Sequence, residues 1–206
     1  MNTEQFLNNS FGSEALVKIT KEYDFQTVLD IGSGAGTHAD FLESRGKKVT
    51  RLDFGKSVYF KKNPNQKIIQ GNYLHQEFGE KFDLIWACHV LEHQININKF
   101  LKKIKLDLQE NGILCITVPP LKHEIVGGHV SLWNAGLLMY NLVLAGFSCR
   151  HARIKSYGYN ISIIIKNSSI NIPTLDYDYG DINRLKEFFP ENLQEGFDGN
   201  ITRLNW

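Results

Sequence analysis

Residues 28–37 read Val-Leu-Asp-Ile-Gly-Ser-Gly-Ala-Gly-Thr, and no other stretch limits the possible folds of this chain as much. The run from Val28 to Ile31 is short and apolar, which is typical of a strand buried on both faces. Glycines then follow at alternate positions, where the missing Cβ lets the chain turn tightly and approach a ligand closely. Ala35, Ala39 and Leu42 have helical spacing, so the free N–H groups of a helix start should point back at the turn. This order of strand, turn and helix predicts a nucleotide pocket.

Strands and helical patterns alternate on both sides of this stretch up to about residue 120. We expect strands at 26–31, 48–53, 67–70, 82–88 and 113–118, and helices at 11–22, 35–46, directly after Asp53, 97–108 and 133–145. Such alternation predicts an α/β fold with a Rossmann-like, doubly wound, mostly parallel sheet of seven strands. Two further strands, 147–155 and 160–166, are separated by a tight turn and predict a C-terminal antiparallel hairpin.

We expect one domain over residues 1–166 and a C-terminal extension over residues 167–206. The extension is polar but contains Phe188, Phe189, Phe197 and Trp206, so it should pack on the same domain or on a partner subunit. A short helix is expected at 183–189. Residues 1–11 are polar and rich in Asn, and we expect them to be loose.

Composition excludes several classes of protein. The chain has 206 residues, of which 42% are hydrophobic and 22% charged, as in ordinary soluble domains. No apolar run approaches the roughly 20 residues of a membrane span, and residues 1–5 do not resemble a signal peptide. A net charge of +1 favours neither nucleic acid nor anionic membrane. Cys88, Cys115 and Cys149 are far apart and odd in number, so we expect reduced thiols, a cytoplasmic protein and no metal site.

Asp53 stands at the end of the second predicted strand, 17 residues after Gly36 (53 − 36). In an open parallel sheet this position lies beside the end of the first strand, where ligands bind. A carboxylate there can accept hydrogen bonds from both hydroxyls of a ribose. The alternative is a surface acid that caps the next helix, and the glycine turn favours nucleotide binding.

Four segments together resemble the motifs of class I S-adenosylmethionine-dependent methyltransferases. Residues 30–36 match that family's acid followed by Gly-x-Gly-x-Gly, whereas dinucleotide dehydrogenases use Gly-x-Gly-x-x-Gly. Leu52-Asp53 is similar to the second motif. Residues 82–85 followed by Val-Leu-Glu-His at 90–93 are similar to the fourth motif, and 111–114 with Pro119 resemble the strand before the acceptor loop. The likeness covers roughly residues 25–166.

The resemblance implies S-adenosylmethionine as cofactor and assigns roles by position. Asp30, Gly32 and Gly34 would hold the methionine end, Asp53 the ribose, Phe54 and Asn72 the adenine, and Ala87 and Cys88 the methionine pocket. The family more often has Asp at the position of Asn72. The full expected cofactor set is Asp30, Gly32, Ser33, Gly34, Gly36, Thr37, Asp53, Phe54, Gly71, Asn72, Tyr73, Ala87 and Cys88.

The acceptor must lie beyond the fourth and fifth strands, where the methyl group would point. A hydroxyl acceptor benefits from a general base, whereas a neutral amine can attack unaided. We expect His129 to be that base: it lies in a glycine-containing loop, and the resemblance implies this role, because family members that act on small hydroxylated molecules often have a similar His before an aromatic residue. The alternative is a histidine that caps the following helix or bonds to the backbone. His89, His93, His123, Trp133 and Tyr157 are the candidate substrate-binding residues. For Glu92 and His93 the favoured interpretation is the first turn of a helix that braces the sheet, with contact to the acceptor as the alternative.

The leading interpretation is an O-methyltransferase of a small hydroxylated metabolite. A sugar, nucleotide sugar or surface-polysaccharide precursor is favoured, because residues 127–133 and 197–206 weakly resemble methyltransferases of polysaccharide pathways and because aromatic residues suit sugars. One alternative is N-methylation of an amine or protein side chain. Another is a non-catalytic, cofactor-binding scaffold subunit, in which the apolar helix 133–145 meets a partner, with a homodimer among the options. Nucleic acid is not expected as a partner, since no basic stripe is present.

Overall fold

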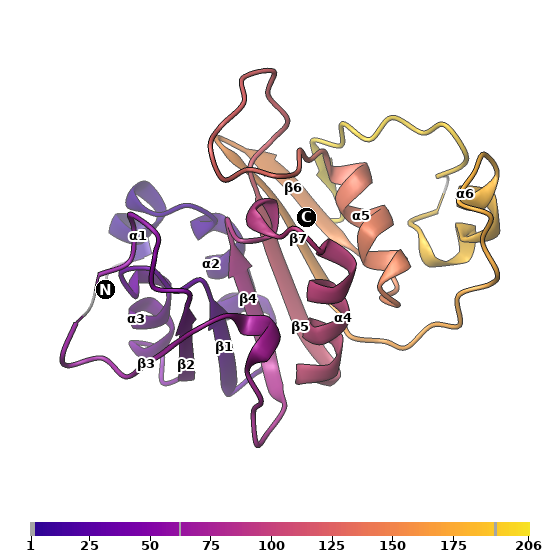
Figure 1. Ribbon diagram of the computed structural model, residues 1–206. Coiled ribbons are helices and arrows are strands. Elements are labelled where there is room, and N and C mark those ends of the chain that lie inside the picture. Colours follow the sequence, from indigo (N-terminus) through magenta and orange to yellow (C-terminus); the bar gives the residue numbers. More distant parts are fainter. Residues whose placement is uncertain (1–2, 62, 192) are drawn as a thin grey trace.

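One mixed sheet runs through the described part of the chain, with helices on both of its faces (Figure 1). The computed structural model describes residues 3–61, 63–191 and 193–206. Within them the sheet has eight strands in the order β3-β2-β1-β4-β5-β7-β6-β8. The strands are β1 (Thr27–Ile31), β2 (Lys48–Asp53), β3 (Ile68–Gln70), β4 (Phe82–Cys88), β5 (Leu108–Val118), β6 (Arg153–Tyr157), β7 (Asn160–Lys166) and β8 (Arg203–Leu204). The helices are α1 (Thr3–Asn9), α2 (Ser13–Glu22), α3 (Thr37–Glu43), α4 (Ile97–Asp107), α5 (Ala135–Leu144) and α6 (Asp181–Arg184), with the 3-10 turns η1 (Tyr73–His75), η2 (Leu91–His93) and η3 (Lys186–Phe188).

The strand directions confirm the predicted fold class. The neighbours from β3 to β5 run parallel, and β7, β6 and β8 pair antiparallel at the far side. The turn between β6 and β7 is formed by Gly158 and Tyr159, as the hairpin pattern predicts, and Gly158 has a positive φ of 52°. The eighth strand, β8, was not expected: two residues of the C-terminal segment pair with β6.

The alternation of side chains along the parallel strands builds two separate cores. Leu29 and Ile31 of β1 pack on the face covered by α4 and α5. Val28, together with Trp86 of β4, packs on the opposite face, which α1, α2 and α3 cover. Both faces of the strands are therefore buried, which explains why their sequences are apolar runs without polar alternation. The carboxyl ends of β1, β2 and β4 are left facing the same edge.

The expectation of a loose N-terminal segment was wrong for residues 3–9, and residues 1–2 lie outside the described residues. Residues 3–9 form α1, because Phe6 is buried and its ring stacks on Phe41 of α3 with 3.9 Å between centroids. Arg45 also donates a hydrogen bond to Thr3 Oγ1, at 2.8 Å. The N-terminal segment is further joined to the sheet through His38, whose Nε2 lies 2.9 Å from the Phe11 carbonyl oxygen.

The expected helix after Asp53 is also not formed: residues 54–61 and 63–67, which the structure describes, contain no helix. Gly55 has a positive φ of 79°, which breaks helical geometry. Farther along, Asn63 accepts a hydrogen bond from the Asn65 backbone N–H at 3.0 Å and closes a turn that carries Pro64. The segment therefore crosses to β3 as an extended loop.

The first hairpin strand starts later than predicted, at Arg153 instead of residue 147. Gly146, with a φ of 95°, ends α5, and the Phe147 N–H donates back to the Leu142 carbonyl oxygen at 3.0 Å. The Cys149 N–H donates to Phe188 O at 2.8 Å, so this stretch holds the C-terminal segment before the strand begins.

The C-terminal segment 167–206 wraps around α5 and rejoins the sheet (Figure 1). Phe188 and Phe189 are buried in the same core as α5. The Gly136 N–H donates to Gly199 O at 2.9 Å, and the Ser156 N–H donates to Thr202 O at 2.8 Å. The predicted helix at 183–189 is split into α6 and η3.

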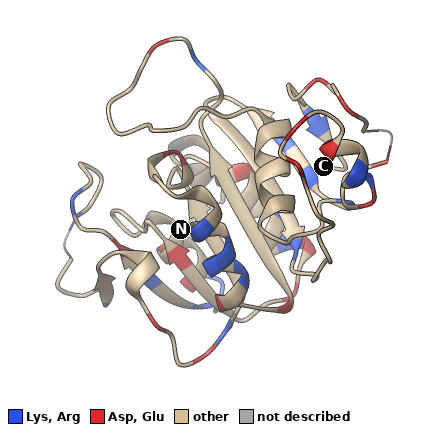
Figure 2. Ribbon diagram, turned by 45° about the vertical axis from the view of Figure 1, so that its right-hand side comes forward, with Lys and Arg blue, Asp and Glu red and all other residues tan. Residues whose placement is uncertain are grey.

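A long loop, residues 119–133, leaves the end of β5 and arches away from the sheet edge (Figure 1). The Leu121 N–H donates to Trp133 O at 2.7 Å and closes the base of this arch. Its charged residues are Lys122 and Glu124, and the rest is drawn in the neutral colour in Figure 2. Basic and acidic residues are interspersed elsewhere, and among the described helices none is both long and apolar enough to cross a membrane.

Candidate cofactor and acceptor site

The glycine turn lies directly between β1 and α3, as its sequence predicts. Gly32, Gly34 and Gly36 all have positive φ values, of 76°, 55° and 84°. The N–H groups of Gly32 and Ser33 donate to Leu52 O on β2, at 2.8 and 3.1 Å, which fixes the turn to the neighbouring strand. A Cβ on Gly32 would lie 2.4 Å from Val90 Cγ2, so the turn also needs glycine to fit against the segment after β4.

Asp30 provides a buried, uncompensated carboxylate just before the turn. It is 1% exposed, and neither of its oxygens has a hydrogen-bond partner among the described residues. Burial raises the pKa of Asp30 to about 7, partly offset by the charge of Arg51. Unpaired buried carboxylates are costly, so this position is suited to a cationic ligand group.

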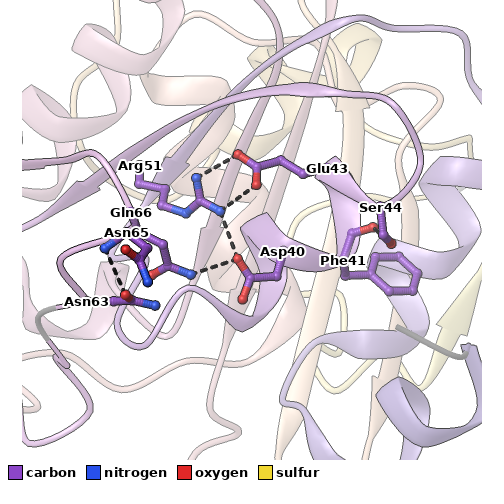
Figure 3. A network of polar contacts seen from close by, with 8 residues as sticks. All are labelled: Asp40, Phe41, Glu43, Ser44, Arg51, Asn63, Asn65 and Gln66. Atoms are coloured by element: carbon purple, nitrogen blue, oxygen red, sulfur yellow. Dashed lines mark hydrogen bonds and ion pairs between the residues drawn. The ribbon is translucent and has the colours of Figure 1, made fainter.

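Arg51 is opposite Asp30 in the parallel register of β1 and β2, but it pairs elsewhere. Its guanidinium donates to Asp40 and Glu43 of α3, at 2.8 and 2.6 Å, and Gln66 joins the network through Asp40 (Figure 3). The network ties α3 to β2 behind the glycine turn. It leaves the Asp30 carboxylate free for a ligand.

Asp53 lies at the predicted place, beside the glycine turn at the edge of the sheet. One carboxylate oxygen accepts from Gly34 N at 2.8 Å and the other from Gly55 N at 2.7 Å. The carboxylate therefore positions the turn, and each oxygen keeps further acceptor capacity for hydroxyl groups. Phe54, the next residue, is 55% exposed at the same edge.

The structure separates the expected adenine-binding residues. Asn72 accepts a hydrogen bond from Leu74 N at 3.0 Å and caps η1, so its oxygen is already engaged. The Gly71 N–H donates to Asp53 O at 2.9 Å, which keeps this backbone at the sheet edge. The Tyr73 side chain points into the core and donates to Asp107 at 2.6 Å, where burial raises its pKa. The side chain of Tyr73 therefore faces the core, so a contact between Tyr73 and the cofactor stays a prediction for its backbone alone.

Ala87, Cys88 and His89 lie where β4 ends. The side chains of Ala87 and Cys88 are buried, so it is their backbone that borders the edge. Burial also raises the pKa of the Cys88 thiol. His89 has a positive φ of 54°, an uncommon conformation for a residue with a side chain. Its Nε2 lies 3.1 Å from Asn160 Oδ1, and its ring lies 4.8 Å from that of Phe11.

Glu92 is the buried centre of a histidine cluster. It is fully buried in η2; its Oε1 lies 3.3 Å from His89 Nδ1 and 3.8 Å from His93 Nε2. Within the described part of the chain neither oxygen of Glu92 makes a hydrogen bond. His129 joins from the loop 119–133, with its ring 5.0 Å from that of His93.

Two contacts hold the loop over this cluster, and a third, within the loop, fixes the backbone at His129. His93 Nδ1 lies 2.8 Å from the Gly128 carbonyl oxygen, the Val130 N–H donates to Glu92 O at 2.8 Å, and the His129 N–H donates to Val126 O at 3.1 Å. Gly128 has a positive φ of 85°, and a Cβ on it would lie 3.2 Å from His93 Nδ1. Glycine is thus required for the loop to come this close to His93.

The remaining candidate substrate residues are dispersed. His123 is exposed on the loop, away from these contacts. Trp133 is 1% exposed in the core, although it borders a small cavity that His129 and Tyr159 also line. The Tyr157 hydroxyl accepts from Ala15 N at 3.3 Å and bonds Ser162 at 2.9 Å, so it points toward α2 and not into the acceptor region.

Two residues that the sequence analysis did not select complete the acceptor side. Phe11 is 48% exposed and, with Tyr159, flanks the His89 ring. Asn160 accepts from Gly12 N at 3.0 Å as well as meeting His89. Phe11 comes from a segment far away in the chain, and no local pattern marks it.

Comparison with known proteins matches residues 29–116 to the model of a family described as "Methyltransferase domain". The fold is also that of a SAM dependent methyltransferase from Archaeoglobus fulgidus, at 15% identity and a TM-score of 0.61, covering 79% of this chain and 96% of that one. Human N-acetylserotonin methyltransferase, solved in complex with SAM, is similar at 18% identity and a TM-score of 0.58, covering 76% and 52%.

This sequence match and the fold together support a class I S-adenosylmethionine-dependent methyltransferase. Its similar curated methyltransferases include (S)-coclaurine N-methyltransferase of Papaver somniferum, 32% identical over 45% of this chain and 29% of that protein. Another is Ubiquinone biosynthesis O-methyltransferase of Rickettsia typhi, 31% identical over 44% of this chain and 39% of that protein. The chain therefore spans less than half the length of these two relatives.

The matched part of the chain ends before the loop 119–133. Residues 29–116 contain the glycine turn, Asp53 and the cluster residues His89, Glu92 and His93. His129 lies outside. The match to the family therefore rests on the part of the chain that is expected to bind the cofactor. The kind of acceptor has to be inferred from the cluster of histidines around Glu92.

Proposed function

We propose that this chain binds S-adenosylmethionine and methylates a hydroxyl group of a small metabolite. The observation that carries the proposal is the group of three histidines, His89, His93 and His129, around the buried Glu92. The cluster lies beyond β4, at the sheet edge where the glycine turn leaves β1. A hydroxyl acceptor needs a group that can receive its proton, and histidine serves this purpose near neutral pH.

The described residues fit the cofactor. The unpartnered carboxylate of Asp30 suits the positively charged methionine end, Asp53 retains acceptor capacity for a ribose diol, and the glycine turn leaves backbone exposed between them. When bound, S-adenosylmethionine supplies a methyl group on a sulfonium, which needs little covalent help. The protein's part is to align the acceptor and to take up the hydroxyl proton, for which we propose His129.

The acceptor region favours a small molecule with both an apolar and a polar side. Phe11 and Tyr159 present aromatic faces, Lys122 lies 4.5 Å from the centre of the Tyr159 ring, and Asn160 and His89 supply polar groups. Aromatic faces beside polar groups suit a sugar ring. We therefore propose a sugar, a nucleotide sugar or a surface-polysaccharide precursor as the acceptor, and a cytoplasmic location, for which three free buried cysteines are suited.

The test uses labelled S-adenosylmethionine with separate pools of nucleotide sugars, phenols and amines. We expect label in a hydroxylated acceptor and a turnover at least about 100-fold lower for His129→Ala. Cofactor affinity, measured by calorimetry, should stay unchanged in this variant. Label only in amines would overturn the proposal.

N-methylation is the second candidate, because one relative is named an N-methyltransferase. A neutral amine needs no base in the transfer step. In that case His129→Ala would keep nearly full turnover, and the label would appear in the amine pool. The same experiment therefore distinguishes the two reactions.

A further inference from the structure

We propose that Glu92, His93 and His129 bind one divalent transition-metal ion, and that Zn²⁺ fits the three side chains best. Their ligand atoms all lie within 4.8 Å of one another. When ligand atoms bind one ion at about 2.0–2.2 Å, they lie roughly 3.4 Å from one another. Side-chain rotations that move the ligand atoms by about 1 Å would therefore complete the site. This proposal reverses the expectation from sequence that the chain holds no metal.

The first argument is the state of Glu92. Its side chain is fully buried, and neither carboxylate oxygen has a hydrogen bond from any residue that the structure describes. A buried carboxylate without compensation costs several kcal/mol or more, by the usual order of magnitude. A cation in contact with Glu92 removes this cost.

The second argument is the orientation of the histidine rings. His93 Nδ1 is 2.8 Å from the Gly128 carbonyl oxygen, which can only accept, so Nδ1 carries the proton. A neutral His93 then directs the lone pair of Nε2 toward Glu92 Oε1, at 3.8 Å. Metal-binding histidines very often donate their other N–H to a carbonyl in this way.

The tautomer of His89 also places an unprotonated ring nitrogen beside Glu92. Asn160 Oδ1 already accepts from Gly12 N, so His89 Nε2 donates to it and Nδ1 is left as a lone pair. That lone pair lies 3.3 Å from Glu92 Oε1. Two electron-rich nitrogens thus face a carboxylate with nothing positive between them, and the arrangement requires either a metal ion or an added proton.

The choice of metal follows from the donors. Two imidazoles and one carboxylate are ligands of catalytic zinc sites, which keep a fourth position open, whereas Mg²⁺ and Ca²⁺ prefer oxygen alone. His129 is half-buried and His93 is 45% exposed on its side chain, so the open position faces the acceptor region. Metal binding does not depend on the acceptor, but the ion's role rests on the proposed function. With the ion bound, His129 would serve as a ligand in place of the base proposed above, and the ion would supply a Lewis acid that lowers the pKa of the acceptor hydroxyl. In either role, His129→Ala lowers turnover, and only the metal role also lowers Zn²⁺ affinity.

The experiment measures Zn²⁺ binding to the full chain after treatment with a chelator and dialysis. Isothermal titration should give one Zn²⁺ per chain, and Co²⁺ as a second probe should show visible absorption bands of a four-coordinate site. Glu92→Gln, His93→Ala and His129→Ala should each weaken Zn²⁺ binding by about 100-fold. His123→Ala is the matched control, since it removes an exposed histidine from the same loop and should leave the affinity unchanged.

Thermal unfolding gives a readout that does not require activity. Zn²⁺ should raise the Tm of the parent and of His123→Ala, but not that of His129→Ala, whose change lies on a surface loop. A folded parent that binds no Zn²⁺, or binds it equally well after all three ligand changes, would overturn the proposal and leave a protonated histidine as the partner of Glu92.

The failure of each proposal can be recognised separately. If Zn²⁺ binds with the expected variant pattern but the label appears only in amines, the metal site stands and the proposed hydroxyl acceptor fails. If a hydroxyl is methylated at full rate by chelator-treated protein that binds no Zn²⁺, the acceptor stands and the metal site fails.

Discussion

Asp30 and Arg51 are neighbours in the register of β1 and β2, yet their charges do not meet. Arg51 is held by Asp40 and Glu43 of α3, which leaves the Asp30 carboxylate buried without a partner among the described residues. Its pKa is raised from 3.8 to about 7 because burial disfavours the charged form. The residue is thus poised to ionise when a positive group arrives.

We expect cofactor binding to release a proton from Asp30. Near a cationic ligand the pKa of Asp30 falls, so binding at pH 6 should release roughly 0.9 proton, and affinity should rise about tenfold from pH 6 to pH 8. Calorimetry in buffers of different ionisation enthalpy measures both quantities. Asp30→Asn should bind more weakly and with no such pH dependence.

The stability of Asp30→Asn provides the control. An acid whose folded pKa is raised contributes stability that is fully present below about pH 3.8 and is lost as pH rises through about 7. Removing the charge should therefore raise the Tm most at pH 8 and by only about a third as much at pH 5. A lower Tm at pH 8 would mean that Asp30 has a stabilising partner, contrary to its environment here.

Among the elements, the loop 119–133 determines how the histidine cluster is arranged. Its base is closed by Leu121 and Trp133, and its tip is positioned on η2 through Gly128, Val130 and Glu92. The geometry of the histidine cluster therefore depends on the backbone at Gly128 as much as on the histidines.

Substitution of Gly128 should separate loop placement from cofactor binding. Gly128→Ala places a Cβ 3.2 Å from His93 Nδ1 at a φ of 85°, a conformation that costs an alanine about 1–2 kcal/mol. We expect turnover to fall at least tenfold while the affinity for S-adenosylmethionine is unchanged. Gly127→Ala is the matched control, because its Cβ meets nothing within 4 Å, and it should behave like the parent.

At the scale of the whole molecule, the two ends of the sheet have different roles. The candidate cofactor residues lie at the carboxyl ends of β1, β2 and β4, whereas β6 and β8 form the other side of the sheet and anchor the C-terminal segment. Trp206 lies there beside Tyr157, with ring centroids 6.4 Å apart, and under Lys18 of α2. The C-terminal segment thus stabilises the fold at a distance from the glycine turn.

Deletion of residues 200–206 should lower stability without affecting cofactor binding. It removes β8 and the Ser156–Thr202 hydrogen bond, a loss of about 3 kcal/mol that corresponds to a Tm lower by roughly 5–10 °C. It also exposes the edge of β6, so self-association should increase in gel filtration. Weaker binding of S-adenosylmethionine by the folded fraction would show that the two ends are coupled.

The sheet could be predicted because its strands are apolar runs between strong turn signals. β2 and β4 match their expected limits, and Asp53 lies beside the turn because neighbouring parallel strands end together. α1 could not be predicted, since it is held by one aromatic, Phe6, that packs on a distant helix. The helix expected after Asp53 failed because Gly55 and an Asn-Pro turn outweigh the rest of that segment.

The location of the candidate cofactor residues at one end of the sheet could be predicted from the sequence, and that of the candidate acceptor residues only in part. His129 was selected from the character of its loop, but its closeness to His93 arises from a carbonyl contact that no sequence spacing encodes. Glu92 looked like a bracing residue because its burial becomes visible only in three dimensions. Trp133 and Tyr157 have suitable side chains for an acceptor site, yet packing turns them inward.

The hydrogen bond between Leu121 and Trp133 has a consequence for how proteins of this kind diverge. Because the two ends of the arch meet, the eleven residues between them (132 − 121) could be exchanged for another insert while the strands beneath keep their register. A change in this one loop would then be sufficient to change the acceptor, while the glycine turn and the strands that position it stay the same.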